Sequence, residues 1–484
     1  MEVHAELQTR SKMFCRCEVA FGGEPNTRVC PVCLGMPGSL PVANKAAIQM
    51  VLKTALALNC QIAYHSIFHR KNYFYPDLPK GYQISQYGET NPIGYDGYLE
   101  IPTPQGALKR IKITRVHLEE DTGKLMHLPA GGSGVDYNRA GVPLMEIVTA
   151  FPPDITNAEE AKEYLVQLRQ ILLYLGVCDG KMEEGSLRCE PNISVRLEGS
   201  DQYGTKTELK NLNSFRSVQL GVQFEVKRQI DALERGERLH QETRGWNEGT
   251  HSSFVMRTKE SENDYRYFPD PDLVPMDFDE GFVEQMRSSL PELPLARSTR
   301  YQMQLSLTSY DADWLVDNRP AARFFDDAVR QGGDPKQVFN WLSGDLTKML
   351  NDSGQSLSDD PGSESKLCRI TPSHLVELTS LISEGAITGK MAKDVFKEVF
   401  ETGQSPQAIV QERGLAQVQD SGAVESWVRE VLAENPEVVA KFRAGQIQVV
   451  GFLVGQVMKK SQGRANPGLV QETINKELSP NSGS

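Results

Sequence analysis

Between Arg115 and Val148 the chain reads RVHLEEDTGKLMHLPAGGSGVDYNRAGVPLMEIV, and this stretch decides the fold of the first half of the protein. Its two ends alternate or run apolar, as strands do, and a glycine-rich loop joins them. Acidic side chains gather near the loop, at Glu119, Glu120, Asp121 and Glu146. Magnesium prefers a few carboxylate oxygens and leaves its other positions to water and phosphate. The stretch therefore has the ingredients of a divalent-cation site, with a solvated acidic turn as the alternative.

The composition excludes several classes of protein. A chain of 484 residues is too long for one hydrophobic core and predicts about two to four domains. There is no run of about 18 apolar residues, and the first residues, MEVHAELQTR, contain no apolar signal region. We therefore expect no membrane span and a cytoplasmic location. The net charge of −12 argues against wholesale non-specific binding of nucleic acid.

Patterns on either side of the opening stretch predict a sheet interrupted by helices. Short alternating runs such as GYLEIPT and NISVRLE indicate a mostly antiparallel sheet. One helix is expected between Asn44 and Asn59, one behind a capping box of Thr156 and Glu159, and one capped by Ser214.

The sequence pattern changes at about Pro291: strand-like alternation stops, and segments with helix-capping residues follow one another. A polar segment rich in glycine and serine over residues 351–366 has the composition of a loop or linker. We expect an α+β protein with a mixed domain over residues 1–290, a helical domain over 291–405 and a small helical tail domain over 406–484.

Four of the eight cysteines are close in sequence, in the pattern C-x-C-x12-C-x2-C formed by Cys15, Cys17, Cys30 and Cys33. Tetrahedral zinc takes four soft ligands from two such short loops. The first pair is separated by one residue where two to four are usual. The pattern predicts a structural zinc site, with free thiols as the alternative.

Two stretches have features of nucleic-acid or nucleotide contact. Residues 70–87 interleave tyrosines, prolines and basic residues, which suits base stacking and phosphate pairing, or else a loop whose tyrosines cover the core. Residues 438–471 contain five basic residues and no acidic one, namely Lys441, Arg443, Lys459, Lys460 and Arg464. This local reversal of charge predicts a phosphate-binding surface, or else a solvated basic face.

Common catalytic motifs do not occur in the chain. It has no G-x-x-x-x-G-K-[ST], no G-x-S-x-G, no H-E-x-x-H and no EF-hand loop, and we interpret the glycines at 131–134 as a flexible loop. What remains is the acidic group, joined by Glu2-Val3-His4, in which a strand would place Glu2 and His4 on one face. Acids with a histidine on strands suggest a metal site for phosphoryl transfer.

Several long runs resemble the B subunit family of the bacterial glutamyl/aspartyl-tRNA amidotransferases. The resemblance extends in order over almost the whole chain and is weakest at about 300–330 and 351–366. Its runs are HAELQTRSKMFC, RKNYFYPDLPKGYQISQ, HLEEDTGK, NRAGVPLMEIV, KMEEGSLRCEPNISVR, ELKNLNSFRSV, DYRYFPDPDLVP and GFLVGQVMKKSQGRANP.

The resemblance implies a fold, a reaction and partners. It implies a cradle-like mixed domain, a helical domain and a small helical tail domain that contacts tRNA. ATP would phosphorylate the side-chain carboxylate of Glu-tRNA(Gln) or Asp-tRNA(Asn), and ammonia would displace the phosphate. The family works as a heterotrimer in which an amidase A subunit releases ammonia from glutamine and a small C subunit ties A to B.

The resemblance also implies roles for individual residues. It gives Glu2, His4, Glu120 and Glu146 as magnesium ligands. Lys71 matches a lysine near the end of the ammonia tunnel, suited to gating or to pairing with Glu120, which would be catalytic with Glu146. Since only Met1 precedes Glu2, where the family usually has a strand, we expect Glu2 to be poorly held.

Further expectations concern the residues around these ligands. Lys80 and Arg139 are the expected phosphate partners of ATP. Glu119 and Asp121 are expected behind the ligands and not among them.

Two other functions were weighed against an ATP-dependent amidotransferase subunit. A non-catalytic tRNA-binding adaptor would explain the basic tail and the cysteines but leaves Glu120 and Glu146 as surface charge. A glutaminase is disfavoured because neither a Ser-Ser-Lys nor a cysteine nucleophile pattern is present.

Overall fold

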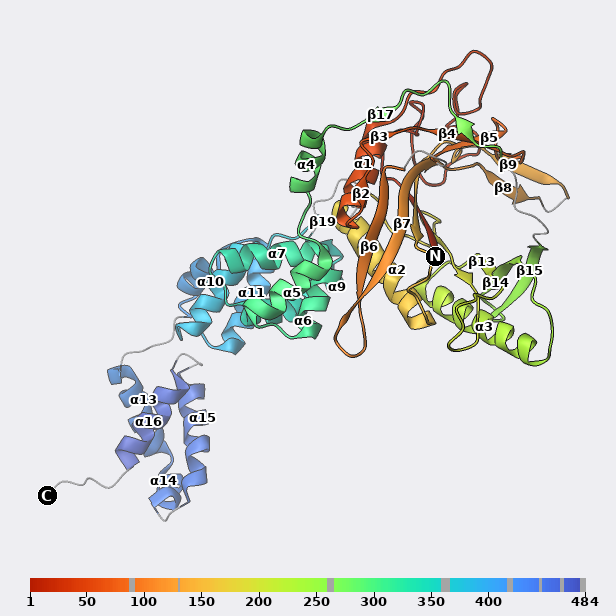
Figure 1. Ribbon diagram of the computed structural model, residues 1–484. Coiled ribbons are helices and arrows are strands. Elements are labelled where there is room, and N and C mark those ends of the chain that lie inside the picture. Colours follow the sequence, from red (N-terminus) through yellow and green to blue (C-terminus); the bar gives the residue numbers. More distant parts are fainter. Residues whose placement is uncertain are drawn as a thin grey trace. The chain divides into compact units, whose positions relative to one another are not determined.

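The structure is a computed structural model of the chain. It describes residues 1–86, 92–128, 131–258, 265–357, 366–415, 421–443, 446–461 and 465–478. The chain forms two compact units, Met1–Ala296 and Arg297–Ser484. The first mixes helices with antiparallel sheets and the second is mainly helical, which confirms the expected fold class (Figure 1). The division into three domains stays a prediction.

A six-stranded sheet forms the centre of the first unit. All of its neighbouring strands pair antiparallel, as the alternating runs predicted. In spatial order the strands are β11 (Leu187–Glu190), β1 (Glu2–Glu6), β10 (Pro143–Thr149), β7 (Leu108–Glu120), β6 (Gly94–Pro102) and β2 (Gln61–Ile62).

Strand β1 is an interior strand of this sheet, with β10 on one side and β11 on the other. Glu2 pairs in register with Val148 and with Glu190, and the Met1 amine donates to Thr149 Oγ1 at 2.8 Å. The expectation that Glu2 would be poorly held was therefore wrong, because strands on both sides fix its backbone.

One face of the sheet is buried under helices α1 (Lys45–Ala57) and α2 (Ala158–Leu175) (Figure 1). Alternation along the strands turns Val3, Ala5 and their neighbours toward these helices, and they are fully buried. The residues between them face the other way and are largely polar. The sheet thus separates an apolar core from a polar face.

The helix boundaries follow their caps. Asn44 accepts from Ala46 and Ala47 at the start of α1, as expected. The cap of α2 is Asn157, which accepts from the backbone of Glu160, so the expected box of Thr156 and Glu159 was one residue early. Thr156 still contributes, since its backbone N–H donates to the Glu160 carboxylate at 2.8 Å.

A second, four-stranded sheet packs with helix α3 (Phe215–Glu234), whose cap Ser214 accepts from the backbone of Ser217 as predicted. The sheet has the order β12 (Asn192–Ile193), β13 (Thr207–Lys210), β14 (Glu242–Asn247) and β15 (Ser252–Thr258), with β13 and β14 parallel.

The remaining strands of this unit form small sheets. The tyrosine- and proline-rich run, of which Tyr87 lies outside the described residues, forms two of these strands and the loop between them. One small sheet contains β4 (His69–Asn72) and β5 (Tyr82–Ser85), which come from this run, and β16 (Phe268–Pro269). A second sheet pairs β3 (His65–Ser66) with β17 (Met276–Asp277), and a third pairs β8 (Lys124–His127) with β9 (Ser133–Asp136). Helix α4 (Glu280–Ser288) follows.

The second unit is built from short helices with proline or glycine at their ends. A short parallel bridge joins β18 (Gln355–Ser356) to β19 (Lys366–Leu367), and half of the expected linker, residues 358–365, lies outside the described residues. The helices are α5 (Pro294–Leu305), α6 (Ser309–Asp317), α7 (Arg319–Arg330), α8 (Pro335–Trp341), the π-helical turn η1 (Leu342–Leu346), α9 (Thr347–Ser353), α10 (Pro372–Ser383), α11 (Gly389–Thr402), α12 (Pro406–Glu412), α13 (Ser421–Glu434), α14 (Pro436–Arg443), the 3-10 turn η2 (Ile447–Val449), α15 (Val450–Lys460) and α16 (Pro467–Leu478).

Helices α13, α15 and α16 surround a small core of their own, centred on Val428, Leu453 and Ile474. Among the described residues, no helix combines the length and apolar character needed to cross a membrane.

Candidate active site

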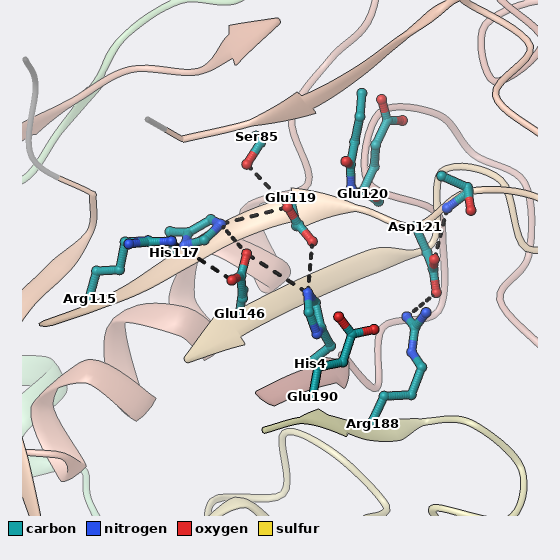
Figure 2. A network of polar contacts seen from close by, with 12 residues as sticks. His4, Ser85, Arg115, His117, Glu119, Glu120, Asp121, Glu146, Arg188 and Glu190 are labelled. Carbon is teal, nitrogen blue, oxygen red and sulfur yellow. Dashed lines mark hydrogen bonds and ion pairs between the residues drawn. The ribbon is translucent and has the colours of Figure 1, made fainter. Parts of the chain in front are cut away.

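The polar face of the six-stranded sheet brings acids and histidines together on three neighbouring strands. In register, His4 of β1 lies beside Glu146 of β10, and Glu146 lies beside His117 of β7. Glu119 follows His117 by two residues and therefore projects from the same face. Figure 2 shows His4, Glu119 and Glu146 pointing toward one another across the strands.

The distances define a compact polar group. His4 Nε2 lies 3.8 Å from Glu119 Oε1 and 3.8 Å from Glu146 Oε2. His117 Nε2 lies 3.1 Å from Glu146 Oε2 and 3.6 Å from Glu119 Oε2. Ser85 Oγ donates to Glu119 Oε2 at 3.1 Å. One ligand atom each from His4, Glu119 and Glu146 lies within 4.8 Å of the others, so the three could hold a metal ion.

Burial and charge set the protonation of this group. Burial by itself lowers the pKa of His117, but the carboxylates of Glu146 and Glu119 outweigh burial and raise that pKa to about 9. Burial opposes ionisation of Glu146, yet His117, His4 and Arg115 hold its pKa well below the usual range. His117 Nδ1 is buried without a hydrogen-bond partner among the described residues. The group is thus a fixed arrangement of two carboxylates and two imidazoles.

Glu120 does not belong to this group, although it was one of the four expected magnesium ligands. It follows Glu119 on β7, so strand alternation turns it to the opposite side of the sheet. There it forms an ion pair with Lys80 and accepts from the Ile84 backbone N–H at 3.0 Å. Glu119, expected only behind the ligands, lies beside His4 instead. The sequence contained the signal, because His117 and Glu119 are two residues apart.

Glu2 forms a second acidic group with Glu190 and Glu208, whose ligand atoms also lie within 4.8 Å of one another. Burial and the carboxylate of Glu146 raise the pKa of Glu2. Lys210 neutralises part of the charge, at 2.6 Å from Glu190 and 3.4 Å from Glu208. Glu2 therefore lies beside the group of His4, Glu119 and Glu146 but is not one of the three residues whose ligand atoms come together there.

The other expected residues have different partners. The ammonium of Lys71 lies 4.8 Å from the centre of the Tyr265 ring, and Glu120 is paired with Lys80 and not with Lys71. Arg139 donates to the backbone carbonyl of Gly123 at 2.9 Å, so its guanidinium is partly occupied in holding the glycine-rich loop.

The edge of the polar face carries an acidic pair, the half-buried Glu6 and the buried Asp121, that the sequence patterns did not reveal. Burial and the neighbouring Asp121 raise the pKa of Glu6 to about 8. Asp121 is paired with Arg188 and lies 3.6 Å from Arg139 Nε. Figure 2 shows Arg188 reaching Asp121 from the strand beside His4. The alternation Glu2-His4-Glu6 could have placed Glu6 on this face.

The four expected cysteines come together in the segment between β1 and α1. The sulfurs of Cys15, Cys17, Cys30 and Cys33 lie within 4.8 Å of one another, so the group could hold a metal ion. A hydrogen bond from Cys15 lowers the pKa of Cys33 to about 4, and that same bond with burial raises the pKa of Cys15.

Comparison with known proteins connects this geometry to one family. A family described as the GatB/GatE catalytic domain matches residues 1–284, and one described as the GatB domain matches residues 323–478. Curated relatives share about half of their residues with this chain over nearly its full length. They include proteins of Thermodesulfovibrio yellowstonii, 50% identical over 478 residues, and Caldanaerobacter subterraneus subsp. tengcongensis, 51% identical over 479 residues. Each alignment covers 99% of this chain and 98% of the relative, and both relatives are named as the B subunit of an aspartyl/glutamyl-tRNA(Asn/Gln) amidotransferase.

Proposed function

The chain belongs to the family of aspartyl/glutamyl-tRNA(Asn/Gln) amidotransferase B subunits, and from this premise we propose that its polar sheet face is the kinase and transamidase site. In the proposed reaction, the side-chain carboxylate of Glu-tRNA(Gln) or Asp-tRNA(Asn) attacks the γ-phosphate of ATP. The acyl phosphate and ADP form, and ammonia then attacks the acyl carbon and expels phosphate.

The observation that supports this proposal is the group of His4, Glu119 and Glu146. A carboxylate is a poor electrophile, and its phosphorylation brings two anions together, which requires a cation at the transferring phosphate. Two carboxylates and an imidazole suit Mg²⁺, although magnesium usually takes more oxygen than nitrogen. When bound, Mg²⁺ would neutralise phosphate charge there.

The protein's own residues keep these ligands in place. His117 Nε2 faces both carboxylates, and the Ser85 hydroxyl fixes one oxygen of Glu119. Partners that orient metal ligands in this way commonly change metal affinity about 10–100-fold when they are removed. Lys71 remains our proposed lysine at the end of the ammonia tunnel and Arg139 our proposed phosphate partner, whereas Lys80, expected from the sequence as a phosphate partner, pairs with Glu120 on the other side of β7.

We propose that ammonia reaches the polar face from the other side of β7, past Lys80 and Glu120. Lys80 and Glu120 line a cavity of about 70 Å³ together with Phe14 and Tyr82. Ammonia is nucleophilic only as NH₃, and its nitrogen must lose a proton after attacking the acyl carbon. The Glu120 carboxylate, which pairs with Lys80, is a suitable proton acceptor on this path.

The cysteine group suits zinc. Four sulfurs that lie within 4.8 Å of one another are the donor set of a structural zinc site. Because they would fill all four tetrahedral positions, none remains for a catalytic water. We propose about one structural zinc per chain, to be checked by metal analysis of freshly reduced protein. Protein prepared without chelators that contains no zinc would contradict this.

The partners follow from the same premise. We propose a cytoplasmic complex with an amidase A subunit, a small C subunit and the misacylated tRNAs, and a tail that contacts tRNA. Lys441 and Arg443 lie in the last turn of α14, and Lys459 and Lys460 lie in the last turn of α15. Lys460 lies 2.8 Å from Glu430 and 2.7 Å from Glu434, so it is the least available to phosphate. Arg464, also in the expected basic surface, lies outside the described residues.

The test is ADP formation that depends on Glu-tRNA, measured in the reconstituted complex. Glu146→Gln keeps the shape of the side chain but removes the charge that faces His4 and His117. We expect it to lower tRNA-dependent ADP formation at least about 100-fold, as removal of a key charge does, while the glutaminase activity of the complex persists.

Glu100→Gln is the matched control, since Glu100 is on β6 of the same sheet and pairs at 3.2 Å with the exposed Arg110. It should leave both activities unchanged. Normal ADP formation by Glu146→Gln would contradict the proposed site and favour the alternative, a non-catalytic tRNA-binding adaptor.

A further inference from the structure

The segment that follows Cys33 contacts Lys80 of the Lys80–Glu120 pair. Gly35 follows the Cys30–Cys33 loop and has a φ of +64°, a conformation that favours glycine. A Cβ at Gly35 would overlap Cγ of Lys80 and lie 3.1 Å from its Cβ and 3.2 Å from its Cα. The backbone of the loop therefore rests on the aliphatic part of Lys80, whose ammonium pairs with Glu120.

A second contact joins the same two groups through a neighbouring lysine. The Lys12 side chain is buried, and its Nζ lies 3.8 Å from Cys33 Sγ and 3.1 Å from the backbone oxygen of Tyr137. A Cβ at Gly141 would lie 3.6 Å from Cys33 Cβ, 3.6 Å from Lys12 Cδ and 3.8 Å from Glu120 Oε2. Cys33, Lys12 and Glu120 thus meet around one glycine.

These contacts have consequences for a long, flexible side chain. A lysine can adopt many rotamers, and its ammonium points in one direction only where packing removes the others. The ammonium of Lys80 lies 5.7 Å from the centre of the Phe14 ring and 5.4 Å from the centre of the Tyr82 ring. The cysteine loop covers the side of Lys80 that faces Gly35. Lys12 offsets part of the negative charge that four metal-bound thiolates would place in this buried region.

We propose that the four-cysteine group positions the Lys80–Glu120 pair: its loop holds the stem of Lys80 through Gly35, and Cys33 anchors Lys12 in the cavity that Glu120 also lines. This inference rests on the proposed zinc and on the proposed role of the pair. The cysteine group would then support the cavity that Lys80 and Glu120 line, in addition to holding its own loop.

The experiment compares Gly35→Ala with Gly22→Ala in the full-length, zinc-loaded chain. Gly22 has a φ of +68°, so alanine suffers the same backbone strain there, but a Cβ at Gly22 has no neighbour within 4 Å. The readout is the labelling rate of Lys80 by a small amine-reactive reagent, measured by mass spectrometry. Lys109, which pairs with Glu160 at 2.8 Å in the same unit, is the internal reference.

We expect Gly35→Ala to raise Lys80 labelling at least fivefold relative to Lys109 without loss of zinc, and Gly22→Ala to leave it unchanged. Removing zinc from the wild-type chain with a chelator should raise the labelling rate of Lys80 by a similar factor. If Gly35→Ala binds no zinc, this comparison of the wild-type chain with and without zinc tests the proposal instead. In the assembled complex, Gly35→Ala should lower kcat for amidation and leave KM for ATP unchanged.

Equal Lys80 labelling in the two variants, or equal protection with and without zinc, would overturn the proposal, as would a chain that binds no zinc. The labelling needs neither ATP nor tRNA, so its failure leaves the proposed kinase site standing. Conversely, loss of tRNA-dependent ADP formation in Glu146→Gln says nothing about Lys80.

Discussion

Replacing His117 by glutamine should remove a specific part of the pH dependence of stability. The pKa of His117 is about 9 in the folded protein because burial, which lowers it, is outweighed by Glu146 and Glu119. In the unfolded chain the pKa returns to about 6.5. Folding therefore favours the protonated form of this side chain.

The sign and the size follow from these two values. A raised histidine pKa contributes stability that is fully present below about pH 6.5 and is lost as the pH rises to about 9. Each tenfold change in proton affinity corresponds to about 1.4 kcal/mol, so the whole contribution is about 3 kcal/mol. The contact responsible is the 3.1 Å approach of His117 Nε2 to Glu146 Oε2.

The assay is urea unfolding of the metal-free chain at pH 6, 7.5 and 9.5. Because the chain has two units, unfolding of the first one is followed by pulsed labelling of Cys189, which is buried in β11. We expect the stability difference between wild type and His117→Gln to shrink by about 3 kcal/mol between pH 6 and pH 9.5.

His65→Gln is the control, since His65 is exposed and its partner Asp277, at 2.6 Å, is exposed too. Its stability difference from wild type should hardly change over the same range. A constant difference for His117→Gln from pH 6 to pH 9.5 would refute the interpretation, because it would mean that His117 takes up no proton on folding.

Two more predictions concern the edge of the site and the tail. Glu6→Gln should stabilise the chain by about 5 kcal/mol at pH 9 and by less than about 1 kcal/mol at pH 5; burial and Asp121 raise the pKa of Glu6 to about 8, so its charge opposes folding increasingly above about pH 4.5. Urea unfolding at the two pH values checks this, and a gain that is equal at both would contradict it. Deleting residues 421–484, whose helices share their own core, should weaken tRNA binding by at least tenfold while ATP turnover on saturating acceptor persists. Filter binding measures this, and unchanged affinity would contradict the tRNA role of the tail; the cut falls after α12 because Ile409 and Val410 are buried in the preceding helices.

Much of the fold could be predicted from local patterns. Alternation located the strands around the glycine-rich loop, and cap residues located the helices, with one start misplaced by a residue at Asn157. The position of β1 inside the sheet could not be read from local pattern, because pairing between distant strands is decided by the burial of the whole face.

The candidate site shows where local reasoning stops. The motif indicated that acids near residue 120 matter, but only strand alternation distinguishes Glu119 from Glu120, and the expectation chose Glu120. The pairing of Lys80 with Glu120 depends on how β5 folds over β7, which no local pattern states. The cysteine group was predictable because short loops with four thiols have few other arrangements.

The central claim is that Glu119, together with His4 and Glu146, holds the cation at the polar face of the sheet. Binding of Mn²⁺, followed by electron paramagnetic resonance in the zinc-loaded chain, tests it by comparing Glu119→Gln with Glu120→Gln. We expect Glu119→Gln to weaken Mn²⁺ binding at least about tenfold and Glu120→Gln to leave it close to wild type. Weakened binding in Glu120→Gln with normal binding in Glu119→Gln would contradict the claim.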